Sequence, residues 1–271
     1  MEERALFVRD GDAFVGTILT QGSWDPGAAN GAMVLALLGH CLEDVPTLVP
    51  MTVSRFTTDL VRPVPLGRRL RVTADVVREG KKIQVVELRL VAEGAGGEAV
   101  EHVRATVLRL RDADLSGRDD VPASTTDVRP ADALEPVAEA EPVRQPGADL
   151  PGFLRAVDMR RARRRDRPGY GWWVRLEAAV VAGEPVRPTS LLTLGFDISN
   201  LIGLEEVSAA VTMINPDVTA HVLRPPVGEW LAVTGDTRVN PALGRGVSTA
   251  ELSDGDGIFA LTSVSQLVQP R

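Results

Sequence analysis

A single carboxylate interrupts one of the most apolar stretches of the chain. Residues 190–204 are mostly apolar or small, and Asp197 lies among them between Phe196 and Ile198. The stretch has the length of a helix and little polar surface, which is typical of a helix buried on most sides. A carboxylate is costly to bury unless it is paired or hydrogen-bonded. We therefore expect Asp197 either to be paired structurally or to act in catalysis.

The sequence offers little to other catalytic chemistries. It contains no Gly-x-Ser-x-Gly motif of the α/β-hydrolase type. Its three histidines, His40, His102 and His221, have no second ligand at metal-binding spacing. Cys41 ends an apolar run that begins at Met33, so we expect a buried thiol rather than a nucleophile. We expect neither a metal nor another cofactor.

The first part of the chain, residues 1–111, combines one apolar helix with long strands. Residues 28–41 are apolar nearly all round and predict a buried helix. From residue 51 to residue 110 the hydrophobic pattern alternates with period two, and glycine-containing turns interrupt it. Such runs pair naturally as antiparallel hairpins. We expect an N-terminal domain in which antiparallel strands surround a helix.

A change of composition divides the chain. Residues 112–150 are rich in aspartate, alanine and proline and have too few large apolar residues to fold alone, so we expect a linker there. Strand-like patterns return in residues 151–271, around the helix predicted from 190. The basic run 160–167 is typical of a solvated hairpin loop, although a landing site for a phosphorylated ligand is the functional alternative.

A short internal echo relates the two domains. Residues 59–67 and 221–228 each read as a strand that ends at Arg-Pro and is followed by a turn containing proline and glycine. Counting back from each Arg-Pro, the part of the first helix that corresponds to Asp197 holds only Met33, Val34, Leu35 and Ala36. The carboxylate therefore exists in one copy only, which favours a one-sided site over a general support of the fold.

With these features the chain resembles the type II acyl-CoA thioesterases, a family with a double hot-dog fold. The segments that carry the resemblance are residues 57–67, 77–82, 194–197, 223–231 and 263–266. The resemblance implies an α+β protein with two tandem antiparallel sheets, each wrapped around a long central helix. It also implies an acyl-CoA substrate, and CoA would be part of the substrate rather than a cofactor.

The resemblance also implies the catalytic residues. Such thioesterases use an aspartate on the second helix, a glutamine on the last strand and a serine or threonine on the strand after the helix. The aspartate falls on Asp197 and the glutamine on Gln266, unless the preceding turn is one residue shorter, in which case Ser265 takes that place. The hydroxyl position falls on Asn215, with Asp217 as a substitute. If these residues are structural rather than catalytic, Asp197 would cap a helix or pair with an arginine. Gln266 would then be an edge-strand residue and Asn215 a turn former.

Composition limits the partners and the location that the sequence predicts, and two other functions compete with thioester hydrolysis. The net charge of −7 and the aromatic content of 4% argue against nucleic acid as a partner. We expect no membrane span, no secretory signal and a cytoplasmic protein. Apolar sheet surface would allow the protein to form a homo-oligomer. Thioester hydrolysis competes with non-catalytic binding of acyl-CoA or an acyl lipid, and more weakly with hydratase or dehydratase chemistry, which usually needs a histidine near Asp197.

Overall fold

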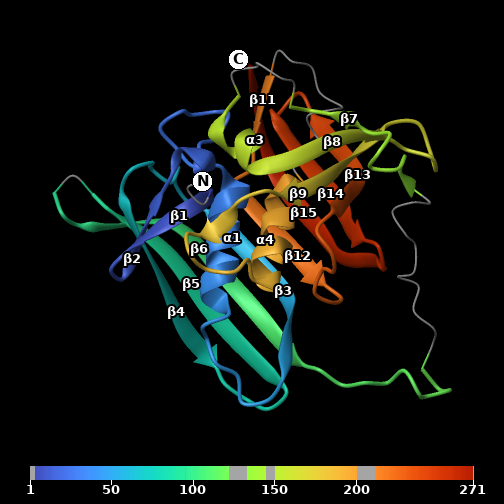
Figure 1. Ribbon diagram of the computed structural model, residues 1–271, viewed down its shortest axis with the longest axis horizontal. Coiled ribbons are helices and arrows are strands. Elements are labelled where there is room, and N and C mark those ends of the chain that lie inside the picture. The colour runs from blue at the N-terminus through green and yellow to red at the C-terminus, as the bar shows by residue number, and fades with distance from the viewer. Residues whose placement is uncertain (1–3, 95, 122–132, 145–149, 200–210, 271) are drawn as a thin grey trace.

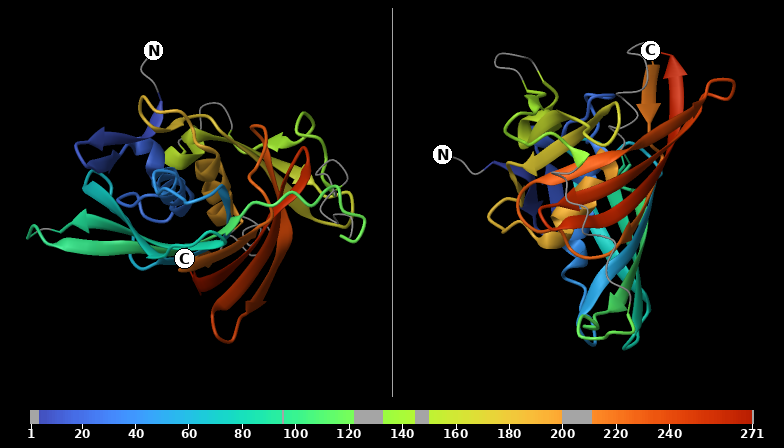
Figure 2. Two further views of the ribbon diagram at one scale, coloured as in Figure 1. Left: turned by 90° about the horizontal axis from the view of Figure 1, so that it is seen from below. Right: turned by 90° about the vertical axis from the view of Figure 1, so that its right-hand side faces the viewer.

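Two helices pack against the concave face of one long, curved sheet (Figures 1 and 2). The computed structural model describes residues 4–94, 96–121, 133–144, 150–199 and 211–270. The helices are α1 (Gly31–Leu42) and α4 (Pro188–Ile198). Both predicted helices are confirmed within these bounds. The part of the predicted 190–204 helix from residue 200 onward lies outside the described residues.

The elements of the first half surround α1. They are β1 (Ala5–Asp10), β2 (Ala13–Gly16), the 3-10 helix η1 (Ile18–Thr20), β3 (Met51–Leu60), β4 (Arg69–Arg78), β5 (Ile83–Glu93) and β6 (Ala99–Arg111). The second half contains β7 (Glu141–Pro142), α3 (Gly152–Ala156), β8 (Val157–Arg163), β9 (Tyr170–Leu176), β10 (Ala179–Val181), β11 (Val211–Ile214), β12 (Asp217–Val222), β13 (Leu231–Asn240), β14 (Arg245–Asp254) and β15 (Gly257–Pro270).

The α+β double hot-dog architecture is confirmed, and the sheets of its two halves are joined edge to edge. In the described residues 15 strands form one sheet, in which β3 of the first half pairs antiparallel with β12 of the second. A second link is the parallel pair of β1 and β10, which lie in different halves of the sequence. Each helix therefore lies on a sheet to which both halves contribute.

The internal repeat appears in the sheet as an approximate two-fold axis. Arg62 and Arg224 follow β3 and β12, and matching one to the other places Thr57 on Thr219. These two threonines are also direct partners in the β3–β12 ladder. A residue that pairs with its own repeat equivalent must lie on the axis relating the two copies.

The segments that follow the predicted linker differ in part from the sequence-based prediction. β8 runs through Arg163, so half of the basic run is strand and the loop begins at Arg164. Residues 152–156 form the short helix α3 instead of continuing the strand-like pattern predicted from residue 151. Arg160, Arg164 and Arg167 each have a carboxylate partner, which agrees with a structural reading of the basic run.

The two long helices lie antiparallel and approach closely. Gly31 faces Asp197, the Leu35 carbonyl accepts a 2.7 Å hydrogen bond from Thr193 Oγ1, and Gly39 faces Thr193. A Cβ atom at Gly39 would lie 2.3 Å from Thr193 Oγ1, so only glycine fits there. These contacts recur every four residues, the spacing that keeps side chains on one face of a helix. The close packing fixes the end of α4 beside the start of α1.

Candidate active site

The carboxylate of Asp197 is buried where α4 meets α1. Asp197 is the penultimate residue of α4, and its side chain lies against the first turn of α1. A Cβ atom at Gly31 would lie 2.7 Å from Oδ2 of the carboxylate. Asn215 Nδ2 donates a hydrogen bond to Oδ1, and the backbone N–H of Ala32 contributes a second. Asp197 is only 7% exposed, so these donors replace its hydration.

Burial makes this carboxylate unusually basic. Desolvation raises the pKa of Asp197 from 3.8 to about 6, and the hydrogen bonds from Asn215 and Ala32 oppose that shift. No arginine, lysine or histidine among the residues that the structure describes forms an ion pair with it. The arginine partner that the sequence suggested for Asp197 is therefore absent from the described residues. An amide and the start of a helix take its place. An acid with a pKa near 6 is suited to accept a proton at neutral pH.

Asn215 is brought to Asp197 by the sheet. It directly follows β11, whose last residue, Ile214, pairs with Leu267 of β15. Asp217, the alternative at this position, instead accepts a 2.9 Å hydrogen bond from the backbone N–H of Ser265. Of the two, Asn215 is the residue whose side chain contacts Asp197.

Gln266 points into the protein from the same region of β15. The strand alternates strictly here, so Val264 and Gln266 are buried while Ser265 is exposed. The last pair of the β11–β15 ladder, Ile214 with Leu267, brings Asn215 and Gln266 to the same end of that ladder. Gln266 is 3% exposed, and its Nε2 donates to Ser248 Oγ at 2.8 Å. The geometry thus favours Gln266 over Ser265 as the inward polar group.

A cavity of about 60 Å³ adjoins Asp197. It has room for a few water molecules, because the centre of each needs roughly 10–15 Å³ of accessible space. Its walls are mostly apolar and come from both halves of the chain: Ser23, Trp24, Asn30, Ala32, Met33, Phe153, Val157, Met159 and Ile198. The site is therefore a small polar spot beside a mostly apolar cavity.

Asn30 is a site residue that the sequence reasoning missed. It is the N-cap of α1, where its side chain accepts a 3.0 Å hydrogen bond from the Ala32 N–H, and it lines the cavity. An asparagine directly before an apolar helical run is a recognised N-cap signal. The predicted helix began at Ala28 and so hid that signal.

The approximate two-fold axis gives this site a counterpart with different residues. Matching Arg62 to Arg224 places Leu35 on Asp197 and Val53 on Asn215. Thr57 pairs with Thr106 on β6 as Thr219 pairs with Ser263 on β15, so three residues further along these strands Arg109 corresponds to Gln266. The three polar residues of the site therefore correspond to Leu35, Val53 and Arg109, and the second copy has no acid at its centre.

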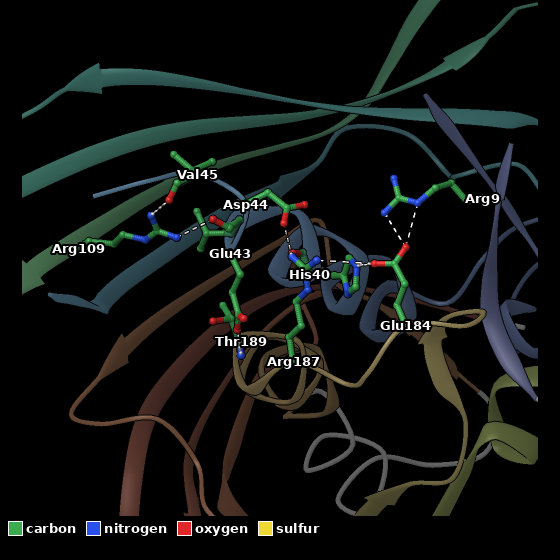
Figure 3. A network of polar contacts seen from close by, with 10 residues as sticks. Arg9, His40, Glu43, Asp44, Val45, Arg109, Glu184, Arg187 and Thr189 are labelled. Atoms are coloured by element: carbon green, nitrogen blue, oxygen red, sulfur yellow. Dashed lines mark hydrogen bonds and ion pairs between the residues drawn. The ribbon is translucent and has the colours of Figure 1, made fainter. Parts of the chain in front are cut away.

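Polar groups near that second copy serve the ends of the helices (Figure 3). Arg109, which is 6% exposed, donates to the carbonyl oxygens of Leu42 and Val45 at the end of α1, at 2.6 and 2.8 Å. Glu43 Oε1 accepts a 2.8 Å hydrogen bond from the backbone N–H of Thr189 at the start of α4. These contacts close helix ends.

His40 and Cys41 lie in the last turn of α1. His40 Nε2 is 2.9 Å from Glu184 Oε2, and burial, the largest cause, lowers the pKa of His40. Burial also raises the pKa of the Cys41 thiol to about 12, so it stays protonated near neutral pH. The described residues contain no cluster of three or more potential metal-binding side chains. None of the described helices is long and apolar enough to span a bilayer.

Comparison with solved structures supports the fold. A candidate thioesterase from Novosphingobium aromaticivorans superimposes with a TM-score of 0.70 at 18% identity, over 97% of this chain and 98% of that chain. The tesB protein of Mycobacterium avium subs paratuberculosis gives 0.65 at 13% identity, over 97% and 96%. A hot-dog protein of unknown function from Alicyclobacillus acidocaldarius gives 0.65 at 14% identity, over 98% and 96%. No curated protein sequence matched the chain.

Family profiles cover nearly the whole described fold. The acyl-CoA thioesterase N-terminal domain matches residues 20–110, and the acyl-CoA thioesterase C-terminal domain matches residues 131–268. The second match begins inside the predicted linker 112–150, where Leu134 is fully buried and β7 pairs with β8. The matched order of the two domains agrees with the two halves of the sheet. The chain belongs to the acyl-CoA thioesterase family and is a thioester hydrolase.

Proposed function

We propose that the protein hydrolyses acyl-CoA by direct attack of a water molecule that Asp197 activates. The observation that carries this proposal is a buried carboxylate, with its pKa raised to about 6, beside a cavity large enough for water. At pH 7 most of the carboxylate is ionised, yet it is more basic than an ordinary aspartate. It can therefore take a proton from water as the oxygen attacks the thioester carbon.

The neighbouring groups have separate roles in this mechanism. Asn215 holds Oδ1 of Asp197 through its Nδ2, so it orients the carboxylate. Gln266 is the second buried amide and, as the family resemblance implies, holds the water. The start of α1, whose Asn30, Ala32 and Met33 line the cavity, supplies the positive end of the helix dipole to the developing oxyanion. Collapse of the tetrahedral intermediate then releases the thiolate of CoA and the carboxylic acid.

The test is thiol release from a panel of short to long acyl-CoA substrates by the full chain and by Asp197→Ala. We expect turnover by the wild type and none above background by the variant, with circular dichroism showing unchanged folding. Glu43→Gln is the matched control, because Glu43 makes a comparable contact at the other end of the helix pair. Retained turnover in Asp197→Ala would remove Asp197 from the mechanism.

Asn215 favours one second candidate, a non-catalytic acyl-CoA binding protein. Thioesterases of this type have a hydroxyl at the position where this chain has an amide. In that case calorimetry would show acyl-CoA binding to the wild type, and no chain length would give thiol release. Turnover of any member of the panel that depends on Asp197 would exclude this candidate.

A further inference from the structure

The side chain of Gln266 lies across two residues of the neighbouring strand. Gly246 of β14 is its direct partner in the ladder, and Ser248 follows on the same buried face. Gln266 Nε2 donates to Ser248 Oγ at 2.8 Å. A Cβ atom at Gly246 would lie 2.8 Å from Gln266 Oε1, closer than side chains normally approach. Strand β14 therefore locates both the nitrogen and the oxygen of the amide.

A second hydroxyl group stands behind Ser248. Thr237 of β13 pairs with Ser248 in the ladder, and Thr237 Oγ1 is 2.6 Å from Ser248 Oγ. Ser248 is 1% exposed, so its hydroxyl depends on these partners rather than on solvent. A serine hydroxyl has one hydrogen to donate. If that hydrogen is directed at Thr237, the Ser248 oxygen can only accept, and it then selects the nitrogen end of the Gln266 amide.

The orientation of this amide matters for a water nucleophile. A water that attacks a carbonyl needs a lone pair pointing at the carbon, so both of its hydrogens should be accepted by the protein. Asp197 accepts one of them in the proposed mechanism, and an amide oxygen can accept the other. An amide turned by 180° would present N–H groups instead and would compete for the lone pair that attacks.

We propose that Ser248 and Thr237 are positioning residues that fix the Gln266 amide in one orientation, with its nitrogen toward Ser248, and that Gly246 leaves the space its oxygen needs. The proposal rests on the proposed function, because it assigns Gln266 the role of holding the reacting water. Ser248 and Thr237 act through Gln266 and do not touch the substrate.

Kinetics of Ser248 variants give the first test. Ser248→Ala should lower kcat about tenfold, which corresponds to the loss of one ordinary hydrogen bond, with little change in KM. The acid limb of the pH profile should stay in place, because Asp197 is untouched. Ser248→Thr keeps a hydroxyl and should restore most of kcat. In a Gln266→Ala background, Ser248→Ala should have no further effect.

Thr262→Val is the matched control, because Thr262 is another buried hydroxyl residue on the inner face of β15. It should leave kcat unchanged. Full additivity of Ser248→Ala with Gln266→Ala, or an equal loss of kcat in Thr262→Val, would overturn the positioning role. Either result would show that the loss comes from general disturbance of the sheet.

A second measurement does not depend on activity. In a ¹⁵N spectrum of the full chain, the side-chain amide of Gln266 should exchange slowly with solvent, and it should exchange faster in Ser248→Ala and in Thr237→Val. Unchanged exchange in both variants would overturn the proposal even in an active enzyme. If the wild type releases no thiol from any acyl-CoA, the proposed function fails, and the exchange rates still decide whether Ser248 and Thr237 fix the amide.

Discussion

At one end of the α1–α4 pair the Asp197 carboxylate is buried against the start of α1, and at the other end Glu43 lies in solvent against the start of α4. Both side chains accept hydrogen bonds from the first N–H groups of the opposite helix, at Ala32 and Thr189. Burial raises the pKa of Asp197 to about 6. A carboxylate in this kind of contact thus caps a helix where it is exposed to water, and it becomes a candidate base where water is excluded.

The approximate two-fold axis extends this comparison to the sheet. The position of Asp197 is taken by Leu35 in the other copy, and that of Gln266 by Arg109. Arg109 is fully engaged with the end of α1 and with Gln84, at 3.1 Å. One copy therefore keeps a buried acid at some cost in stability, while the other uses its buried positions to fix the helix. The following changes test that division.

The largest effect is expected from Asp197→Asn. Loss of the base should lower kcat by roughly 10²–10⁴, the usual contribution of general base catalysis. The folded-state pKa lies above the unfolded value, so ionisation of Asp197 costs stability as pH rises from 3.8 to about 6. At pH 8 the variant should be more stable than the wild type by up to about 3 kcal/mol.

Urea denaturation of both proteins at several pH values measures that difference, which should shrink as pH falls through this window. A variant that is inactive and no more stable at pH 8 would show that the carboxylate is well compensated in the fold. The pH profile of wild-type kcat/KM should show an acid limb near pH 6, because protonated Asp197 cannot accept a proton.

Leu35→Asp should be the most damaging change in the other copy. It places an acid at the counterpart of Asp197, without an asparagine beside it, since Val53 occupies that position. An unpaired buried charge typically costs about 3–5 kcal/mol. Thermal unfolding should show a large loss of stability, and thiol release by the remaining folded protein should not rise. A stable Leu35→Asp protein would mean that the two copies differ less in polarity than their residues suggest.

Two glycines of α1 should separate the chemical end of the helix pair from the structural end. A Cβ atom at Gly31 would press on the Asp197 carboxylate at 2.7 Å, whereas one at Gly39 would meet Thr193 Oγ1 and the Thr189 carbonyl oxygen at 2.3 and 2.5 Å. Gly39→Ala should cost about 1–3 kcal/mol of stability through overpacking. Gly31→Ala should instead reduce kcat by displacing the carboxylate. Equal effects of both variants on kcat, after correction for the folded fraction, would contradict this separation.

The sequence was sufficient for the helices and the repeat because these depend on local patterns. The apolar runs that became α1 and α4, and the Arg-Pro pairs after β3 and β12, lie within short windows. The joining of the two sheets through Thr57 and Thr219 could not be predicted, because the pairing of two edges leaves no local signal.

The site itself was predictable only in part. Asp197 was conspicuous because its neighbours are apolar, and the alternation of β15 decides between Gln266 and Ser265 once the register of the strand is known. The correspondence between Arg109 and Gln266 in the two copies could not be predicted from the sequence. It depends on the registers of the β3–β6 and β12–β15 ladders, which no pattern in the sequence marks.

The smallest effect is expected from Glu43→Gln. The glutamine oxygen can still accept from the Thr189 N–H, so the variant loses only the charge at the start of α4. For an exposed side chain, that charge is worth about 0.3–1 kcal/mol at low ionic strength. Chemical denaturation in low and high salt should show a small loss of stability that salt abolishes, with kcat unchanged. A large loss of kcat would place Glu43 in the reaction and would mean that both ends of the helix pair take part in chemistry.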